Sequence, residues 1–189
     1  PTPSPSEPSW PRDGSFVEYH MTGGENDPPG LYYHVDEDAR LRLVYNAGQW
    51  SGTCTWTRSE RNTVFDDDGN AAGYRWENTS GSERITIAPL REPTDVRVGQ
   101  EVHVDVFGPS CGHGDLGYGG NLTVQRQESH TAPRQADGSM TWYAEWQPEW
   151  PAHAYAYWDV DTGLVVAWRE SGRNSYSDGW MVDTDAPLS

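Results

Sequence analysis

The stretch "AYAYWDVDTGLVVAW", residues 154–168, indicates a β-hairpin. Its first half follows the period-two pattern of a strand. One expected face carries Ala152, Ala154, Ala156 and Trp158, and the other carries His153, Tyr155, Tyr157 and Asp159. Residues 160–163, Val-Asp-Thr-Gly, supply a reversal in which Gly163 adopts the positive φ of tight turns. Leu164, Val166 and Trp168 then begin a return strand.

The Asp161-Thr162-Gly163 tripeptide also occurs in the catalytic loops of aspartic proteases. Such enzymes need two of these loops facing each other, so that paired carboxylates share a proton. The second candidate, residues 183–185, reads Asp-Thr-Asp and lacks the glycine, and Leu164 stands where Ser or Ala usually follows. The pattern therefore favours a hairpin turn, and we expect no enzymatic activity.

Alternating apolar and polar residues recur along the rest of the chain. They include Leu41, Leu43 and Tyr45; Val102, Val104 and Val106; and Met140, Trp142, Ala144 and Trp146. Clusters of Gly, Pro, Asn or Asp bound these segments, as they do strands. The sequence predicts an all-β fold with little helix: an antiparallel meander, sandwich or strongly curved open barrel of about 11–13 short strands.

The first 13 residues differ from the remainder. Prolines at positions 1, 3, 5, 8 and 11 alternate with serines, which favours an extended strip. We therefore predict a tether over residues 1–13 and one β domain over 14–189. Within that domain, Phe16 to Met21 can pair as a strand.

The amino-acid composition limits the classes of partner that the chain can bind. Only 34% of residues are hydrophobic, but 10 Trp and 10 Tyr are present, so rings must supply much of the core. The net charge is −16, and all 13 basic residues are Arg. Such a surface repels phosphate backbones and anionic lipids, so we expect neither nucleic-acid binding nor electrostatic membrane docking. No apolar run is long enough to span a bilayer.

Cysteines and glycosylation sequons indicate an oxidising compartment. Cys54 and Cys111 are the two cysteines of the chain, and we expect a disulfide between them. Asn78 and Asn121 each begin an Asn-x-Ser/Thr sequon. The sequence thus predicts a secreted or cell-surface glycoprotein.

Residues 157–182 resemble the tail of LolA-like envelope proteins. The shared pattern is an aromatic strand, then Asp-x-x-Thr-Gly-Leu-Val, then a polar strand; here it includes Tyr157, Asp159, Thr162, Gly163, Leu164 and Val165 and ends near Val182. The resemblance implies a strongly curved antiparallel sheet around a helical plug that carries lipid or lipoprotein acyl chains. No amphipathic helix suited to a plug is evident in this sequence.

Two segments contain residue types that bind metals. Asp66, Asp68, Asn70 and Glu77 occupy positions 1, 3, 5 and 12 of a calcium-loop pattern, but Ala71 replaces the usual glycine. A hairpin turn is the alternative for this acidic stretch. Cys111, His113 and Asp115 alternate in a glycine-rich loop without a further zinc ligand nearby. We expect no cofactor, with calcium as the alternative.

Three non-enzymatic functions remain open. The leading hypothesis is a structural subunit of an extracellular filament or surface layer that binds copies of itself through the N-terminal segment or sheet edges. The alternatives are a LolA-like carrier of a hydrophobic ligand and a carbohydrate-binding module with an aromatic platform. The platform candidates, which could equally pack in the core, are Trp142, Trp146, Trp150, Tyr155 and Tyr157.

Overall fold

A computed structural model of the chain describes residues 10–26, 33–108, 118–130, 138–146 and 153–189. The all-β prediction is confirmed, and the described residues contain no helix. The ten strands are β1 (Phe16–Asn26), β2 (Tyr33–Asn46), β3 (Gln49–Phe65), β4 (Ala71–Ile85), β5 (Glu101–Val106), β6 (Tyr118–His130), β7 (Ser139–Trp146), β8 (His153–Asp159), β9 (Val165–Ser171) and β10 (Ser175–Thr184). They are fewer than predicted because β2, β3 and β4 run for 14, 17 and 15 residues.

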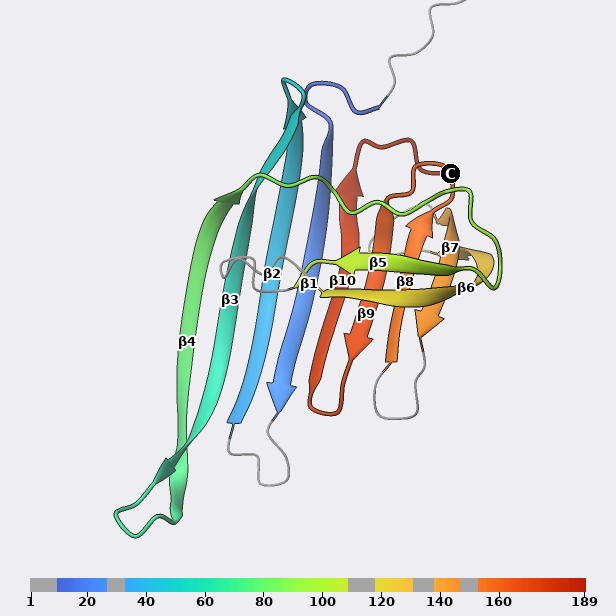
Figure 1. Cartoon of the computed structure of the whole chain (residues 1–189). Coiled ribbons are helices and arrows are strands. Elements are labelled where there is room, and N and C mark those ends of the chain that lie inside the picture. The colour runs from blue at the N-terminus through green and yellow to red at the C-terminus, as the bar shows by residue number, and fades with distance from the viewer. Residues whose placement is uncertain (1–9, 27–32, 109–117, 131–137, 147–152) are drawn as a thin grey trace, which may run out of the picture.

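All ten strands belong to one antiparallel sheet (Figure 1). Its order is β4-β3-β2-β1-β10-β9-β8-β7-β6-β5, so two meanders meet where the first strand pairs with the last. Residues 16–21, predicted to pair as a strand, lie in β1 at the centre of the sheet. The edges are β4 and β5.

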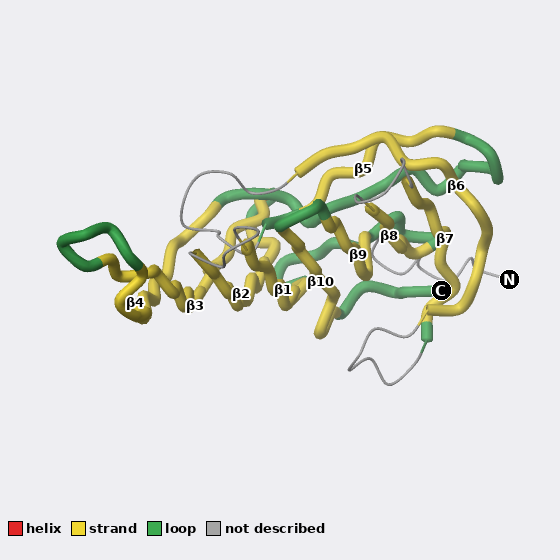
Figure 2. The backbone as a smooth tube through the Cα atoms, turned by 90° about the horizontal axis from the view of Figure 1, so that it is seen from below, coloured by secondary structure: helices red, strands yellow, loops and turns green. Residues whose placement is uncertain are grey.

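The sheet curls over itself at β6. The first half of β6, up to Thr123, pairs with β5, and the second half pairs with β7. A bulge between Val124 and Arg126 allows the strand to bend there. The β5–β6 pair, here called the flap, crosses the concave side of β8, β9 and β10 (Figures 1 and 2). The result is a strongly curved open sheet.

The core lies between the flap and the sheet. Val102, Val104 and Val124 of the flap are buried, whereas alternate residues of β5 are exposed. Opposite them, Tyr19 and Trp168 pack edge to face with ring centroids 5.7 Å apart. Trp158, Trp168, Tyr19 and Phe107 are among the largest fully buried side chains, as expected for a chain whose core depends on rings.

The connection from β4 to β5 closes one end of this core and runs across the sheet in Figure 1. Trp158 Nε1 donates to the Pro93 carbonyl at 3.0 Å, and the Glu92 amide donates to the Gly163 carbonyl at 2.8 Å. The Glu92 side chain is only 9% exposed, and burial raises the pKa of its carboxyl to about 7.

Glu92 should therefore make stability depend on pH. A carboxyl whose pKa is higher in the folded state binds its proton more tightly there, so the free energy of unfolding falls as pH rises from about 4.5 to 7. The loss is on the order of 2–3 kcal/mol. Urea titrations at pH 5, 6, 7 and 8 measure it, and Glu92→Gln should flatten this part of the profile and raise stability at pH 8. Asp67→Asn, at an exposed position of the β3–β4 turn, is the matched control. An unchanged slope in Glu92→Gln would refute the assignment.

The described end of the predicted tether contacts the domain. Trp10 packs on Trp50 with ring centroids 5.5 Å apart, and its Nε1 donates to Asp185 Oδ1 at 3.1 Å. The Arg91 guanidinium lies 4.8 Å from the centre of the Trp10 ring. Residues 1–9 lie outside the described part of the chain.

Candidate functional site

The β8–β9 turn is held together by a buried carboxylate. Asp159 Oδ1 accepts from the amides of Asp161 and Thr162 and from Thr162 Oγ1, at 3.2, 2.8 and 2.8 Å. Its Oδ2 accepts from the amide and hydroxyl of Ser189 at 2.8 and 2.6 Å. Asp161 is exposed in the turn. The stretch that suggested a protease motif is thus a hairpin, and Asp159 ties it to the last residue of the chain.

The calcium-loop residues lie at the tip of the β3–β4 hairpin. Asp66 Oδ1 accepts from the amides of Asp68 and Asn70 at 3.0 and 2.8 Å, which is the bonding of a tight turn. Glu77 lies within β4 and forms an ion pair with Arg75 at 2.9 Å. Across the described ranges, no group of three or more His, Cys, Asp or Glu side chains could hold a metal ion. The geometry favours the turn interpretation.

The covalent sites remain predictions. Cys54 is fully buried in β3, but Cys111 lies outside the described residues, as do His113 and Asp115. The sequon residues Asn78, in β4, and Asn121, in β6, are both exposed.

The five platform candidates do not share one face. Strand alternation places Trp142 and Trp146 on the concave face of β7, whereas Tyr155 and Tyr157 belong to the other face of β8. Tyr157 stacks on His130 with ring centroids 3.9 Å apart. Trp142 packs against the core, and Trp146 is 47% exposed. Trp150 lies outside the described residues.

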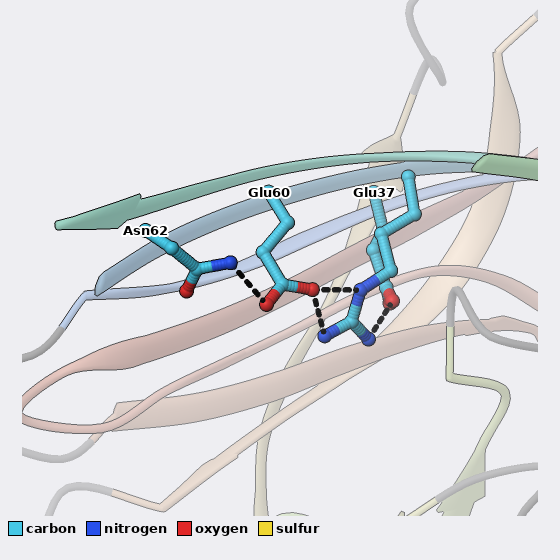
Figure 3. Close-up of polar contacts among 4 residues, drawn as sticks. Glu37, Glu60 and Asn62 are labelled. Carbon is cyan, nitrogen blue, oxygen red and sulfur yellow. Dashed lines mark hydrogen bonds and ion pairs between the residues drawn. The ribbon is translucent and has the colours of Figure 1, made fainter. Parts of the chain in front are cut away.

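A polar network continues the concave face beyond the core, on β2 and β3 (Figure 3). Arg58 donates to Glu37 at 2.9 Å and to Glu60 at 3.2 Å, and Asn62 Nδ2 donates to Glu60 at 3.0 Å. One guanidinium thus lies between two carboxylates and offsets their mutual repulsion. These contacts stabilise the long strands where the apolar core has ended.

A pocket of about 330 Å³ opens between the flap and the ends of β7, β8 and β9. Val104, Val106 and Leu122 line it from the flap, and Trp146 and Ala154 line it from the sheet. Asn121, Arg169 and Glu170 add polar groups. We call it the flap pocket.

The β4 edge is the second candidate. Thirteen of the 15 residues of β4 are exposed, on both faces of the sheet, and β4 is paired on one side, with β3. At its tip, Val64, Phe65, Tyr74 and Trp76 are each more than 40% exposed. Arg61 lies over the Tyr74 ring at 4.7 Å. The edge therefore combines free backbone groups with an aromatic surface.

Comparisons with known proteins add little. The sequence matches no known protein family and no curated protein. Among solved structures, a β-barrel-like protein of the domain of unknown function DUF1849 from Brucella abortus aligns over 92% of this chain and 97% of its own, with 9% identity and a TM-score of 0.39. A likeness this weak carries no argument about function. In the described part of the chain, no helix is long and apolar enough to cross a membrane.

Proposed function

We propose that the chain is a structural module of an extracellular assembly and that two copies pair along β4. The observation that carries this proposal is the 15-residue edge strand with 13 exposed residues. A row of unpaired N–H and C=O groups is a template for another strand. A pair formed this way would extend the sheet from one copy into the next.

Strand β4 carries inward-facing charges and a bulge next to Gly73, which often protect edge strands, but its length and its lack of Pro still allow pairing. Edge strands commonly carry Pro or inward-pointing charges, or are very short. Strand β4 has no Pro, and its exposed charges have both signs: Arg75, Glu77, Glu83 and Arg84. Mixed charges permit self-complementary contacts despite the net charge of −16.

Among the registers that pair nearly the whole of β4, those charges favour one. In an antiparallel pair related by a twofold axis, opposing residues come from the same face of the sheet. An axis at Thr79 places Arg75 opposite Glu83 of the second copy, and Tyr74 opposite Arg84. Symmetry repeats each contact, which gives two ion pairs and two cation–π contacts.

Neighbouring registers are less favourable. Moving the axis by one residue, to Ser80, places Glu77 opposite Glu83 and creates two repulsive contacts. Moving it to Asn78 or Gly81 leaves no opposite charges facing each other. We therefore expect the Thr79 register. An interface of this kind joins two copies, and an additional contact through the N-terminal segment would extend such pairs into a filament or layer.

A charge swap tests the register. Glu83→Arg puts like charges opposite each other twice, so the dimer Kd should rise at least about tenfold. Arg75→Glu should do the same, and the double variant Arg75→Glu, Glu83→Arg should restore most of the affinity. Sedimentation velocity over a concentration series measures these constants. Because Asn78 lies in β4, the protein should come from a host that does not glycosylate it.

The control is Glu101→Arg, which makes the same change of charge at an exposed position on the opposite edge strand. It should leave the Kd within about twofold. A wild type that stays monomeric at the highest concentrations would contradict pairing. A double variant no better than the single variants would contradict the register.

A further inference from the structure

The flap pocket is lined by residues of β5 to β9, whereas β4 forms the opposite edge of the sheet. Its function can therefore be considered separately from pairing along β4. Its volume of about 330 Å³ is at the lower end for small-molecule sites. The aliphatic lining from Val104, Val106 and Leu122 suits an apolar body of modest size. The polar groups that accompany this lining determine which ligand class is accepted.

Glu170 is the acidic side chain that lines the pocket, and it is exposed to solvent. Among the described residues it forms no hydrogen bond or ion pair, and partial burial raises the pKa of its carboxyl. It follows Trp168, the buried core residue, by two positions in β9 and therefore points to the concave side. A cationic partner would offset the desolvation of this carboxylate.

The arginine of the pocket is already neutralised. Arg169 donates to both carboxylate oxygens of Asp178, Nε to Oδ1 at 2.5 Å and Nη2 to Oδ2 at 2.7 Å. A bidentate pair of this kind leaves little positive charge for a ligand. Carboxylate or phosphate ligands would therefore meet Glu170 without a compensating cation.

Trp146 supplies a second feature that favours cations. Its side chain is 47% exposed and lines the pocket, so one part of the indole remains available. Indole faces attract ammonium groups through the ring quadrupole, and aromatic rings commonly recognise quaternary ammonium ligands. A carboxylate and an indole at one apolar pocket form a recognition pair for such ions.

We infer that the flap pocket binds a small organic cation, an ammonium group carried on an apolar body. The apolar body lies against the flap valines and Leu122, and the ammonium lies between Glu170 and the Trp146 ring. Binding at this site goes beyond the proposed assembly function and does not depend on it.

Three probes with the same six-carbon chain test the inference: hexyltrimethylammonium, 1-hexanol and hexanoate. Isothermal titration calorimetry measures binding in about 150 mM salt. Salt at this concentration screens the general attraction of cations to the acidic surface. The ammonium should bind at least about tenfold more tightly than the alcohol, and hexanoate should bind most weakly. Glu170→Gln should remove the advantage of the ammonium and leave the affinity for the alcohol unchanged.

Two further variants keep the result decisive. Asp67→Asn removes one exposed carboxylate from the β3–β4 turn and should leave all three affinities unchanged. Ala154→Phe places a ring in the pocket and should weaken all three probes. Equal binding of ammonium and alcohol, or an equal loss in Asp67→Asn and Glu170→Gln, would overturn the inference. Neither outcome bears on pairing along β4, which is measured by sedimentation without probes.

Discussion

Replacing Asp159 by Ala should lower the free energy of unfolding by about 3–5 kcal/mol. The side chain is fully buried and accepts five hydrogen bonds, two of them from Ser189. Removing the carboxylate leaves the Thr162 hydroxyl and several amides without their acceptor, and it releases the end of the chain. Urea denaturation monitored by tryptophan fluorescence measures the loss.

Asp161→Ala is the matched control, since it removes the same side chain from the same turn. Asp161 is exposed, so its replacement should change the free energy of unfolding by less than about 0.5 kcal/mol. Equal effects of the two substitutions would show that the turn tolerates loss of either carboxylate, contrary to the structural role given to Asp159. The Asp161 variant also tests the hairpin interpretation, which expects no peptidase activity to be lost with it.

Gly179→Ala should lower the free energy of unfolding by about 3 kcal/mol or more. An added Cβ would lie 2.0 Å from the Trp168 ring, which is 2% exposed. That ring is held between Tyr19 and Phe107, with centroids 5.7 and 6.2 Å away, so it has little room to shift. Overpacking of this kind forces side chains from their rotamers and displaces strands.

Gly120→Ala provides the comparison for this steric prediction. A Cβ at Gly120 meets nothing within 4 Å, so thermal unfolding of that variant should stay close to wild type. The melting temperature of Gly179→Ala should fall by roughly 10 °C or more. A fall of less than 2 °C would mean that the Trp168 ring is not fixed as the packing implies.

Much of the fold could be predicted from local patterns in the sequence. The alternation of Val102 and Val104 with charged residues predicted a one-sided strand, and both valines are buried. Gly163 marked the β8–β9 turn correctly and has φ 72°. Such signals need only near neighbours in sequence, which is why the all-β class and this hairpin could be predicted.

Other features depend on contacts between distant residues. Asp159 was expected simply to face away from Trp158, yet its role comes from Ser189, 30 positions later. The length of β4 was also missed, because its polar sequence lacks a buried face. The sequence around Glu170 did not indicate a binding site, because the pocket beside this residue forms only where the flap crosses the sheet. A long polar segment bounded by turns could have indicated an exposed edge strand.

Pairing along β4 is tested most directly by cysteine cross-linking at the expected twofold axis. In the Thr79 register, Thr79→Cys faces its own copy with Cβ atoms about 4.5–5.5 Å apart, within reach of a disulfide after small adjustments. In Ser82→Cys the two copies of residue 82 are displaced by six strand positions, about 20 Å. Under mild oxidation, Thr79→Cys should yield a reducible dimer on a non-reducing gel, and Ser82→Cys should remain monomeric. Equal cross-linking at both positions, or none at position 79, would contradict the account.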